Sequence, residues 1–301
     1  MKKTVKLLSL IMLPAALMLA CATTDEQVSM TSAQSKIEFY INTDATGIHI
    51  DWGDGTKSNT NDGDRYEYYG DLVLFAFSHK YTDEKSHTIV VKATNFKHLA
   101  CAHNQLTSLD VSKNTALTKL WCESNKLTSL DVSKNTALTG LSCFFNQLMD
   151  LDVSKNTALT ELSCSINQLT NLDVSKNTAL KDLDCGDNQL TNLDVNKNTA
   201  LTGLWCGHNQ LTSLDVGKNT ALNELDCSYN QLTGLDVSKN TALTKLWCGS
   251  NPLTSLDVSK CPKLETLDIS NCKLLASLYC NYDKVKVIAD GCDALSMLNS
   301  K

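Results

Sequence analysis

The sequence has little proline, few aromatic residues and a single arginine. Its 301 residues include 3 prolines and 6% aromatics, and Arg65 is the lone arginine. Nucleic-acid binding needs clustered cations, and a formal net charge of −6 argues against it. The same balance argues against electrostatic adsorption to an anionic bilayer. The six histidines are scattered, with no catalytic-triad, metal-ligand or phosphate-loop spacing. We therefore predict no enzymatic activity, no cofactor and no metal.

A basic N-terminus is followed by one apolar run, Leu7 to Leu19, which is too short to cross a hydrocarbon core of about 30 Å as a helix. The run ends in Leu17-Met-Leu-Ala-Cys21, which resembles a bacterial lipobox. The resemblance implies a signal peptide at 1–20 and lipidation of Cys21, a firm anchor. No aspartate follows Cys21, and among bacterial lipoproteins an aspartate at that position retains the protein in the inner membrane. The resemblance therefore favours the outer membrane, and surface display stays open. The alternative is an ordinary secretory signal with a chance cysteine.

A β-rich segment is expected at residues 35–95, after a tether at 21–34. Apolar and polar residues alternate there in four short runs, separated by glycine-containing turns. The run Asp51-Trp-Gly-Asp-Gly-Thr56, with His79-Lys-Tyr81, resembles the PKD family of immunoglobulin-like modules, which implies a β-sandwich that serves as a spacer or binding domain. Asp51 and Asp54 leave calcium open as an alternative to a turn-forming role.

From residue 96 the sequence repeats every 21 residues. Cysteine and asparagine recur at fixed phases, in the pattern Leu-x-x-Leu-x-Cys-x-x-Asn-x-Leu, which is typical of a leucine-rich repeat. The cysteines are Cys101, Cys122, Cys143, Cys164, Cys185, Cys206, Cys227 and Cys248. The asparagines are Asn104, Asn125, Asn146, Asn167, Asn188, Asn209, Asn230 and Asn251. Each asparagine is expected to bond backbone groups at its turn, so that stacked copies form a ladder.

Each repeat contains two similar halves. The phrase from Leu117 to Asn125 returns from Leu127 to Asn135, with valine in place of cysteine. This nested pattern resembles the IRREKO-type class of bacterial leucine-rich repeats. The predicted fold is mostly β: a solenoid of about nine 21-residue coils with two strands per coil at 96–288, capped by the sandwich at 35–95 and closed by a C-terminal cap at 289–301. Near the C-terminus the spacing of the cysteines suggests a slip of half a coil.

Two regular columns have simple structural interpretations. The cysteines are expected to be small buried apolar groups, because parallel Cβ vectors suit neither disulfides nor tetrahedral zinc. A disulfide among the late cysteines, Cys261, Cys272, Cys280 and Cys292, stays open. The second column is acidic, and lysines three residues on can compensate it; calcium is the alternative. Its members are Asp110, Asp131, Asp152, Asp173, Asp194, Asp215, Asp236 and Asp257.

The outward positions of the first half-repeat vary between coils and include aromatic residues. Exposed aromatic side chains favour a binding surface, although drift among repeat copies is the alternative. The candidate ligand-binding residues are Trp121, Phe144, Phe145, Trp205, His208, Tyr229 and Trp247. The predicted function is a cell-envelope lipoprotein that binds a partner protein on a host or neighbouring cell, for adhesion. A glycan-binding surface lipoprotein and a structural envelope protein are the alternatives.

Overall fold

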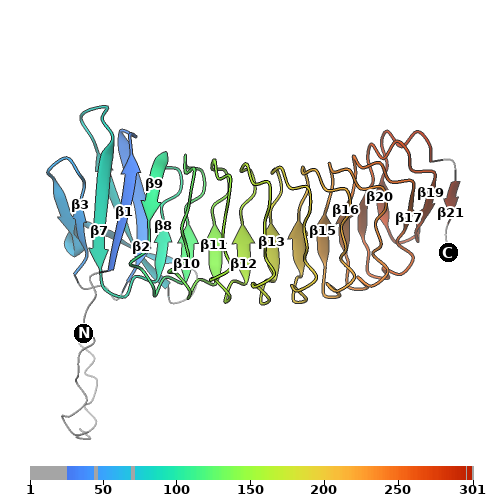
Figure 1. The fold of residues 1–301 in the computed structure, drawn as a ribbon, viewed down its shortest axis with the longest axis horizontal. Coiled ribbons are helices and arrows are strands. Elements are labelled where there is room, and N and C mark those ends of the chain that lie inside the picture. Colours follow the sequence, from blue (N-terminus) through green and yellow to red (C-terminus); the bar gives the residue numbers. More distant parts are fainter. Residues whose placement is uncertain (1–25, 44–46, 69–71, 296, 300–301) are drawn as a thin grey trace, which may run out of the picture.

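The computed structural model describes residues 26–43, 47–68, 72–295 and 297–299. The predicted signal peptide and Cys21 lie outside these residues. Figure 1 shows a β-sandwich at one end of a long row of stacked coils. Within the described part of the chain, no helix has the length and hydropathy needed to cross a bilayer.

The N-terminal part consists of two antiparallel sheets that enclose one apolar layer. Strands β3, β4, β7 and β1 form one sheet in the order β4-β3-β7-β1, and β2, β6 and β5 are neighbours in the other. Val28, Phe39 and Trp52 are buried between them. The strands are β1 (Glu26–Ser32), β2 (Lys36–Asn42), β3 (His49–Asp51), β4 (Lys57–Asn59), β5 (Asp64–Tyr68), β6 (Leu72–Lys80) and β7 (His87–Ala93), with a 3-10 turn η1 at Thr60–Asp62.

The tether expected at residues 21–34 is wrong from Glu26 onward. Strand β1 pairs with β7 along its whole length and with β9 (Leu106–Asp110) of the first coil on its other edge. Val28 and Met30 are fully buried, so this strand is part of the sandwich core. Strand β1 therefore links the sandwich to the solenoid.

The turn at 51–56 is held by its own side chains. The Asp54 carboxylate accepts hydrogen bonds from the Thr56 backbone N–H and hydroxyl and contacts His79 Nε2 at 2.7 Å. These bonds, from Thr56 first, hold the pKa of Asp54 well below its usual range. Asp51 accepts a bond from the Gly53 N–H. Both carboxylates thus form the turn, and no group of three or more metal-ligating side chains occurs among the described residues.

The coils stack through a parallel sheet along one side of the solenoid. Each short strand pairs in register with the next, as in Leu120 opposite Leu141. Strand β8 also pairs antiparallel with β2, so the sheet continues into the sandwich, which covers the first coil. Its strands are β8 (His98–Ala100), β10 (Lys119–Trp121), β11 (Gly140–Ser142), β12 (Glu161–Ser163), β13 (Asp182–Asp184), β14 (Gly203–Trp205), β15 (Glu224–Asp226), β16 (Lys245–Trp247), β18 (Thr266–Asp268) and β20 (Lys286–Ile288).

The solenoid of about nine coils is as predicted, but the second strand is not present in every coil. On that side the described strands are β9, β17 (Ser255–Asp257), β19 (Ser277–Tyr279) and β21 (Met297–Asn299). In the middle coils this side is linked mainly by one backbone bond per coil, such as Gln168 N–H to Leu148 O at 2.8 Å. One bond per coil is too few to make a ladder.

The C-terminal coils keep their phase, so the expected half-coil slip is wrong. Strand β18 continues the sheet of β16, while β19 pairs with β17 on the other side. Ile269 takes the buried place that cysteine holds in earlier coils, and Cys280 takes the place of the valine. Pairing of β21 with β19 carries the stack beyond residue 288, into the stretch expected to be a separate cap.

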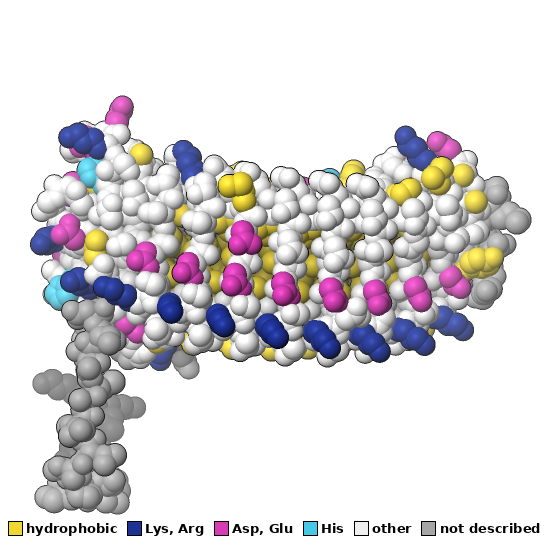
Figure 2. Space-filling view, viewed as in Figure 1, with side chains coloured by type: hydrophobic (Ala, Val, Ile, Leu, Met, Phe, Trp, Pro, Cys, Tyr) yellow, Lys and Arg dark blue, Asp and Glu magenta, His cyan; other side chains and the backbone are white. Residues whose placement is uncertain are grey.

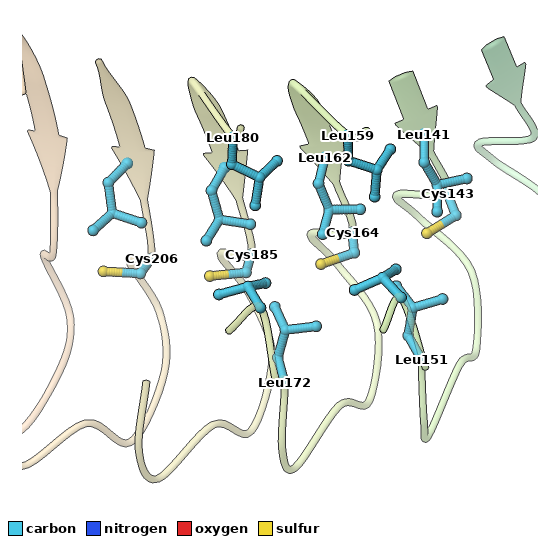
Figure 3. Close-up of a cluster of buried hydrophobic side chains, with 14 of the residues drawn as sticks. Leu141, Cys143, Leu151, Leu159, Leu162, Cys164, Leu172, Leu180, Cys185 and Cys206 are labelled. Atoms are coloured by element: carbon cyan, nitrogen blue, oxygen red, sulfur yellow. The ribbon is translucent and has the colours of Figure 1, made fainter. Parts of the chain in front are cut away.

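The core is one continuous pillar of leucine and cysteine. Figure 3 shows the Cys143, Cys164, Cys185 and Cys206 side chains stacked in parallel beneath leucines. All eight cysteines of the column are fully buried, which confirms their predicted role as small apolar groups. Burial raises the pKa of the Cys143 thiol to about 12. The twelve described cysteines are free.

Two asparagine ladders satisfy backbone groups at the turns. In the first ladder, Asn167 Nδ2 donates to the carbonyls of Cys143, Cys164 and Ser165, and its Oδ1 accepts from the Leu148 N–H at 2.9 Å. In the second ladder, Asn177 Nδ2 donates to two carbonyls, but its buried Oδ1 has no partner among the described residues. The predicted role of the asparagines is confirmed.

Two of the late cysteines replace asparagine in these ladders. Cys261 follows Asn240 by one period, and its thiol donates to Val237 O as Asn240 Nδ2 does to Val216 O. Cys272 likewise follows Asn251 and bonds to Cys248 O. Cys261 and Cys272 therefore break the spacing of the cysteine column because they occupy asparagine positions of the coil.

The acidic column is solvent-exposed and runs beside a column of lysines. Figure 2 shows the two rows parallel along the solenoid. Asp131 Oδ1 accepts the Ser133 N–H, which holds the pKa of Asp131 below its usual value, and Lys134 adds to this. These contacts agree with the compensated, turn-forming interpretation of the column.

Candidate functional site

A groove of about 580 Å³ lies on the outer face of the parallel sheet, from β10 to β15. Trp121 and Trp205 stand in the same row of the sheet at four coils' separation, about 19 Å for strands about 4.8 Å apart. Between them the row carries only Ser142, Ser163 and Asp184. Small residues between two half-buried indoles leave the hollow.

Glycine on the floor makes room for side chains that lie flat on the sheet. A Cβ on Gly203 would meet the Trp205 ring at 2.3 Å, so this ring lies back over the Gly203 backbone. A Cβ on Gly140 would meet the Lys119 side chain at 2.7 Å. Lys119 crosses Gly140 and reaches Glu161, with Nζ to Oε2 at 3.0 Å.

Five carboxylates line the groove, and the serine hydroxyls nearest to them serve as donors. Asp184 Oδ2 accepts from the hydroxyls of Ser163 at 3.1 Å and Ser165 at 2.7 Å. Asp226 accepts both the N–H and the hydroxyl of Ser228. The groove therefore presents oxygen acceptors to a ligand. The carboxylates are those of Glu161, Asp182, Asp184, Asp187 and Asp226.

One rim of the groove carries bulky side chains on a left-handed backbone. Phe145, Ile166 and Tyr229 have φ of 54°, 51° and 51°, a conformation that is unfavourable for large and above all β-branched residues. All three side chains are exposed, at 54%, 42% and 51%. The left-handed turn recurs in each coil from Ser124 to Ser250, and these three coils place exposed apolar side chains on it. The rim is therefore suited to contact with another molecule.

The structure brings together some of the predicted site residues and separates others. Trp121, Trp205 and His208 line the groove. Tyr229 lies next to it, with its ring stacked on His208 at 4.0 Å between centroids. Phe144, Phe145 and Trp247 do not line it. Phe145 lies on the rim, one coil before Ile166. Trp247 lies beside Lys245, whose Nζ is 5.9 Å from the centre of the indole ring.

Sequence reasoning missed the carboxylates and Ile166. Glu161 and Asp182 occupy the first outward position of their strands, where no tryptophan, tyrosine or phenylalanine marks the row. Asp184 and Asp226 share the row of Trp205, whose aromatic residues are the more conspicuous signal in the sequence. The signal that could have found these carboxylates is an outward acidic residue with no lysine at the same position of the next coil.

The comparisons with known proteins agree with this architecture. A family model described as Leucine Rich repeats (2 copies) matches residues 241–282. No curated protein matches the chain. The repeated coils, their parallel sheet and this match define a leucine-rich repeat protein.

Several solved structures are similar to the chain. The functional domain of InlJ from Listeria monocytogenes, described as including a cysteine ladder, is 34% identical, with 69% of this chain and 57% of that one covered and a TM-score of 0.42. The internalin InlF from the same species is 23% identical, with 63% and 55% covered and a TM-score of 0.47. A leucine-rich repeat protein from Leptospira interrogans is 20% identical, with 67% and 71% covered and a TM-score of 0.38. The chain thus spans little more than half the length of the first two.

Proposed function

We propose that this protein is a cell-envelope lipoprotein that binds a partner protein through the groove and its rim, in adhesion to a host or neighbouring cell. The observation that carries the proposal is the groove itself. The side of the coils that bears Asp131 is nearly uniform from repeat to repeat, whereas the strand side has three tryptophans, a hollow and exposed apolar residues on its rim. Aromatic anchors with a polar surround are typical of protein-binding surfaces.

The proposal assigns binding rather than catalysis to the chain. His79 and His87 are paired with Asp54 and Asp83 in the sandwich, at 2.7 Å in each case. His208, at the groove, is stacked on Tyr229 and lies 3.8 Å from Asp187. Each of these histidines has a role in packing.

Photo-crosslinking on intact cells tests the binding surface. A photoreactive phenylalanine analogue at Trp205 is expected to give a discrete crosslinked species with a protein partner. The same analogue at Thr170, an exposed residue on the other side of the coil, is expected to give none. Crosslinks from position 170 and not from 205 would refute the assignment of the face.

The anchor is tested in the same cells by fractionation. Cys21→Ser is expected to move the chain from the membrane fraction to the soluble fraction, because the lipidated thiol is the proposed attachment. Retention of the Cys21→Ser chain in the membrane would contradict a lipid anchor while leaving the crosslinking result intact.

A further inference from the structure

Lysines pair with carboxylates at one end of the groove and just beyond the other end, and no ion pair forms between these two places among the described residues of the strand rows. Lys119 pairs with Glu161 at one end. Beyond the other end, Lys245 pairs with Glu224 at 2.8 Å and lies over the Trp247 ring. Among the ion pairs of the described residues, none involves Asp182, Asp184 or Asp226. These three carboxylates lie between the two lysines.

Contacts within the chain show which groups pair with these carboxylates and tryptophans. At both ends a lysine ammonium meets a carboxylate, and at one end it also lies over an indole face, as a cation–π contact requires. The middle of the groove offers the same two groups, carboxylates and a tryptophan face, without a cation. Trp205 lies in the same row as Asp184 and Asp226, between them.

Hydrogen-bonding chemistry separates a cationic side chain from a sugar. The Ser163 and Ser165 hydroxyls already donate to Asp184, so the polar side chains of the floor mainly accept. A guanidinium has five N–H donors and no acceptor, and an ammonium has three donors and none. A sugar hydroxyl both donates and accepts, and the carboxylates of this floor would serve only its proton.

We propose that the occupant of the groove is an extended segment of the partner protein that carries arginine or lysine side chains onto Asp182, Asp184 and Asp226, with a cation against the Trp205 ring. This inference rests on the proposed function and specifies the partner's chemistry. Asp184 and Asp226 are two strands apart, about 10 Å. A segment in the extended polyproline II conformation has three residues per turn and rises about 3.1 Å per residue, so basic side chains three residues apart lie on one face, about 9 Å apart, and match the two carboxylates.

A synthetic peptide tests this chemistry without the natural partner. The probe is a fluorescent nonapeptide of glycine and serine with arginine at its second, fifth and eighth positions, and its control has citrulline at those positions. Fluorescence anisotropy at low salt is expected to show saturable binding of the arginine peptide, at least tenfold weaker binding of the citrulline peptide, and a loss of affinity with added salt. Equal binding of both peptides would overturn the proposal.

Matched variants separate the groove from general attraction to an acidic protein. Asp184→Asn with Asp226→Asn keeps the side-chain shapes and is expected to weaken the arginine peptide at least tenfold. Asp173→Asn with Asp194→Asn removes the same charge from the acidic column on the other side and is expected to change binding less than twofold. Asp187→Asn alters an exposed groove carboxylate that lies 3.8 Å from His208, and it is expected to weaken the arginine peptide less than the Asp184/Asp226 variant does. An equal loss in the Asp173/Asp194 variant would contradict the proposal.

The crosslinking and peptide experiments together separate the binding face from the chemistry of its occupant. If crosslinking at position 205 yields a protein partner but the peptide does not bind, the binding face stands and the cationic chemistry is wrong. If an uncharged oligosaccharide panel binds in a Trp205-dependent way and the arginine peptide does not, the occupant is a glycan, and this inference is refuted.

Discussion

Asn167→Ala is expected to destabilise the solenoid by about 3 kcal/mol, clearly more than Asn177→Ala. Both residues are buried in the same coil and both donate from Nδ2 to backbone carbonyls. The difference lies in Oδ1. Asn167 Oδ1 is the partner that the structure gives to the buried Leu148 N–H, and its removal leaves that donor unpaired.

Asn177 provides a matched control because its removal orphans no donor. The two carbonyls that it reaches, of Val153 and Asn156, keep bonds from the backbone N–H groups of Asn156 at 3.0 Å and Leu159 at 3.1 Å. Its own Oδ1 is an unpaired buried acceptor that the substitution deletes. We expect a cost of about 1 kcal/mol, measured as the shift in urea midpoint. A cost for Asn177→Ala equal to that for Asn167→Ala would contradict the assigned roles of the ladders.

The second large effect concerns the thiols. In the folded protein, alkylation of the cysteine column is expected to be slower than that of a model thiol by about a thousandfold or more, because only the thiolate reacts. Burial raises the pKa of Cys143 to about 12 and that of Cys261 and Cys280 to about 11. The buried thiols also lie out of reach of the reagent.

Mass spectrometry after a short alkylation pulse measures this protection residue by residue. Half-buried Cys292 should react first, and the buried thiols should react only when denaturant opens the stack. Cys272 and Cys280, near the end of the solenoid, should become reactive at lower denaturant than Cys164, since end coils have fewer neighbours. Native-state modification of Cys164 at the rate of Cys292 would be incompatible with a continuous buried pillar.

The coil was predictable because its period places the same chemistry at the same point each time. Leucine, cysteine and asparagine recur at fixed phases, and stacking is the arrangement that buries all of them at once. Strand β1 was missed because only Val28 and Met30 are apolar in a run of polar residues. Its burial depends on pairing with β7 and β9, which are distant in sequence.

The groove was predictable only in part. The tryptophans stand out against repeats that are otherwise alike, and this located Trp121 and Trp205. The hollow between them depends on which coils carry serine and glycine at neighbouring positions, and its charge depends on where lysines pair. Lys119 reaches Glu161 two coils away, past Gly140. The repeat pattern in the sequence does not reveal a contact that skips a coil.

Pulsed electron paramagnetic resonance tests most directly whether 21 residues make one coil. With Cys21 and Cys292 changed to serine, nitroxides can be placed at Thr128→Cys together with Thr191→Cys, Thr212→Cys or Thr233→Cys, all exposed positions at one phase of the repeat. The pairs lie three, four and five coils apart. The structure predicts separations of about 14, 19 and 24 Å, rising by an equal step with each coil. Distances that fail to increase in equal steps would contradict the stacked coils, and with them the groove.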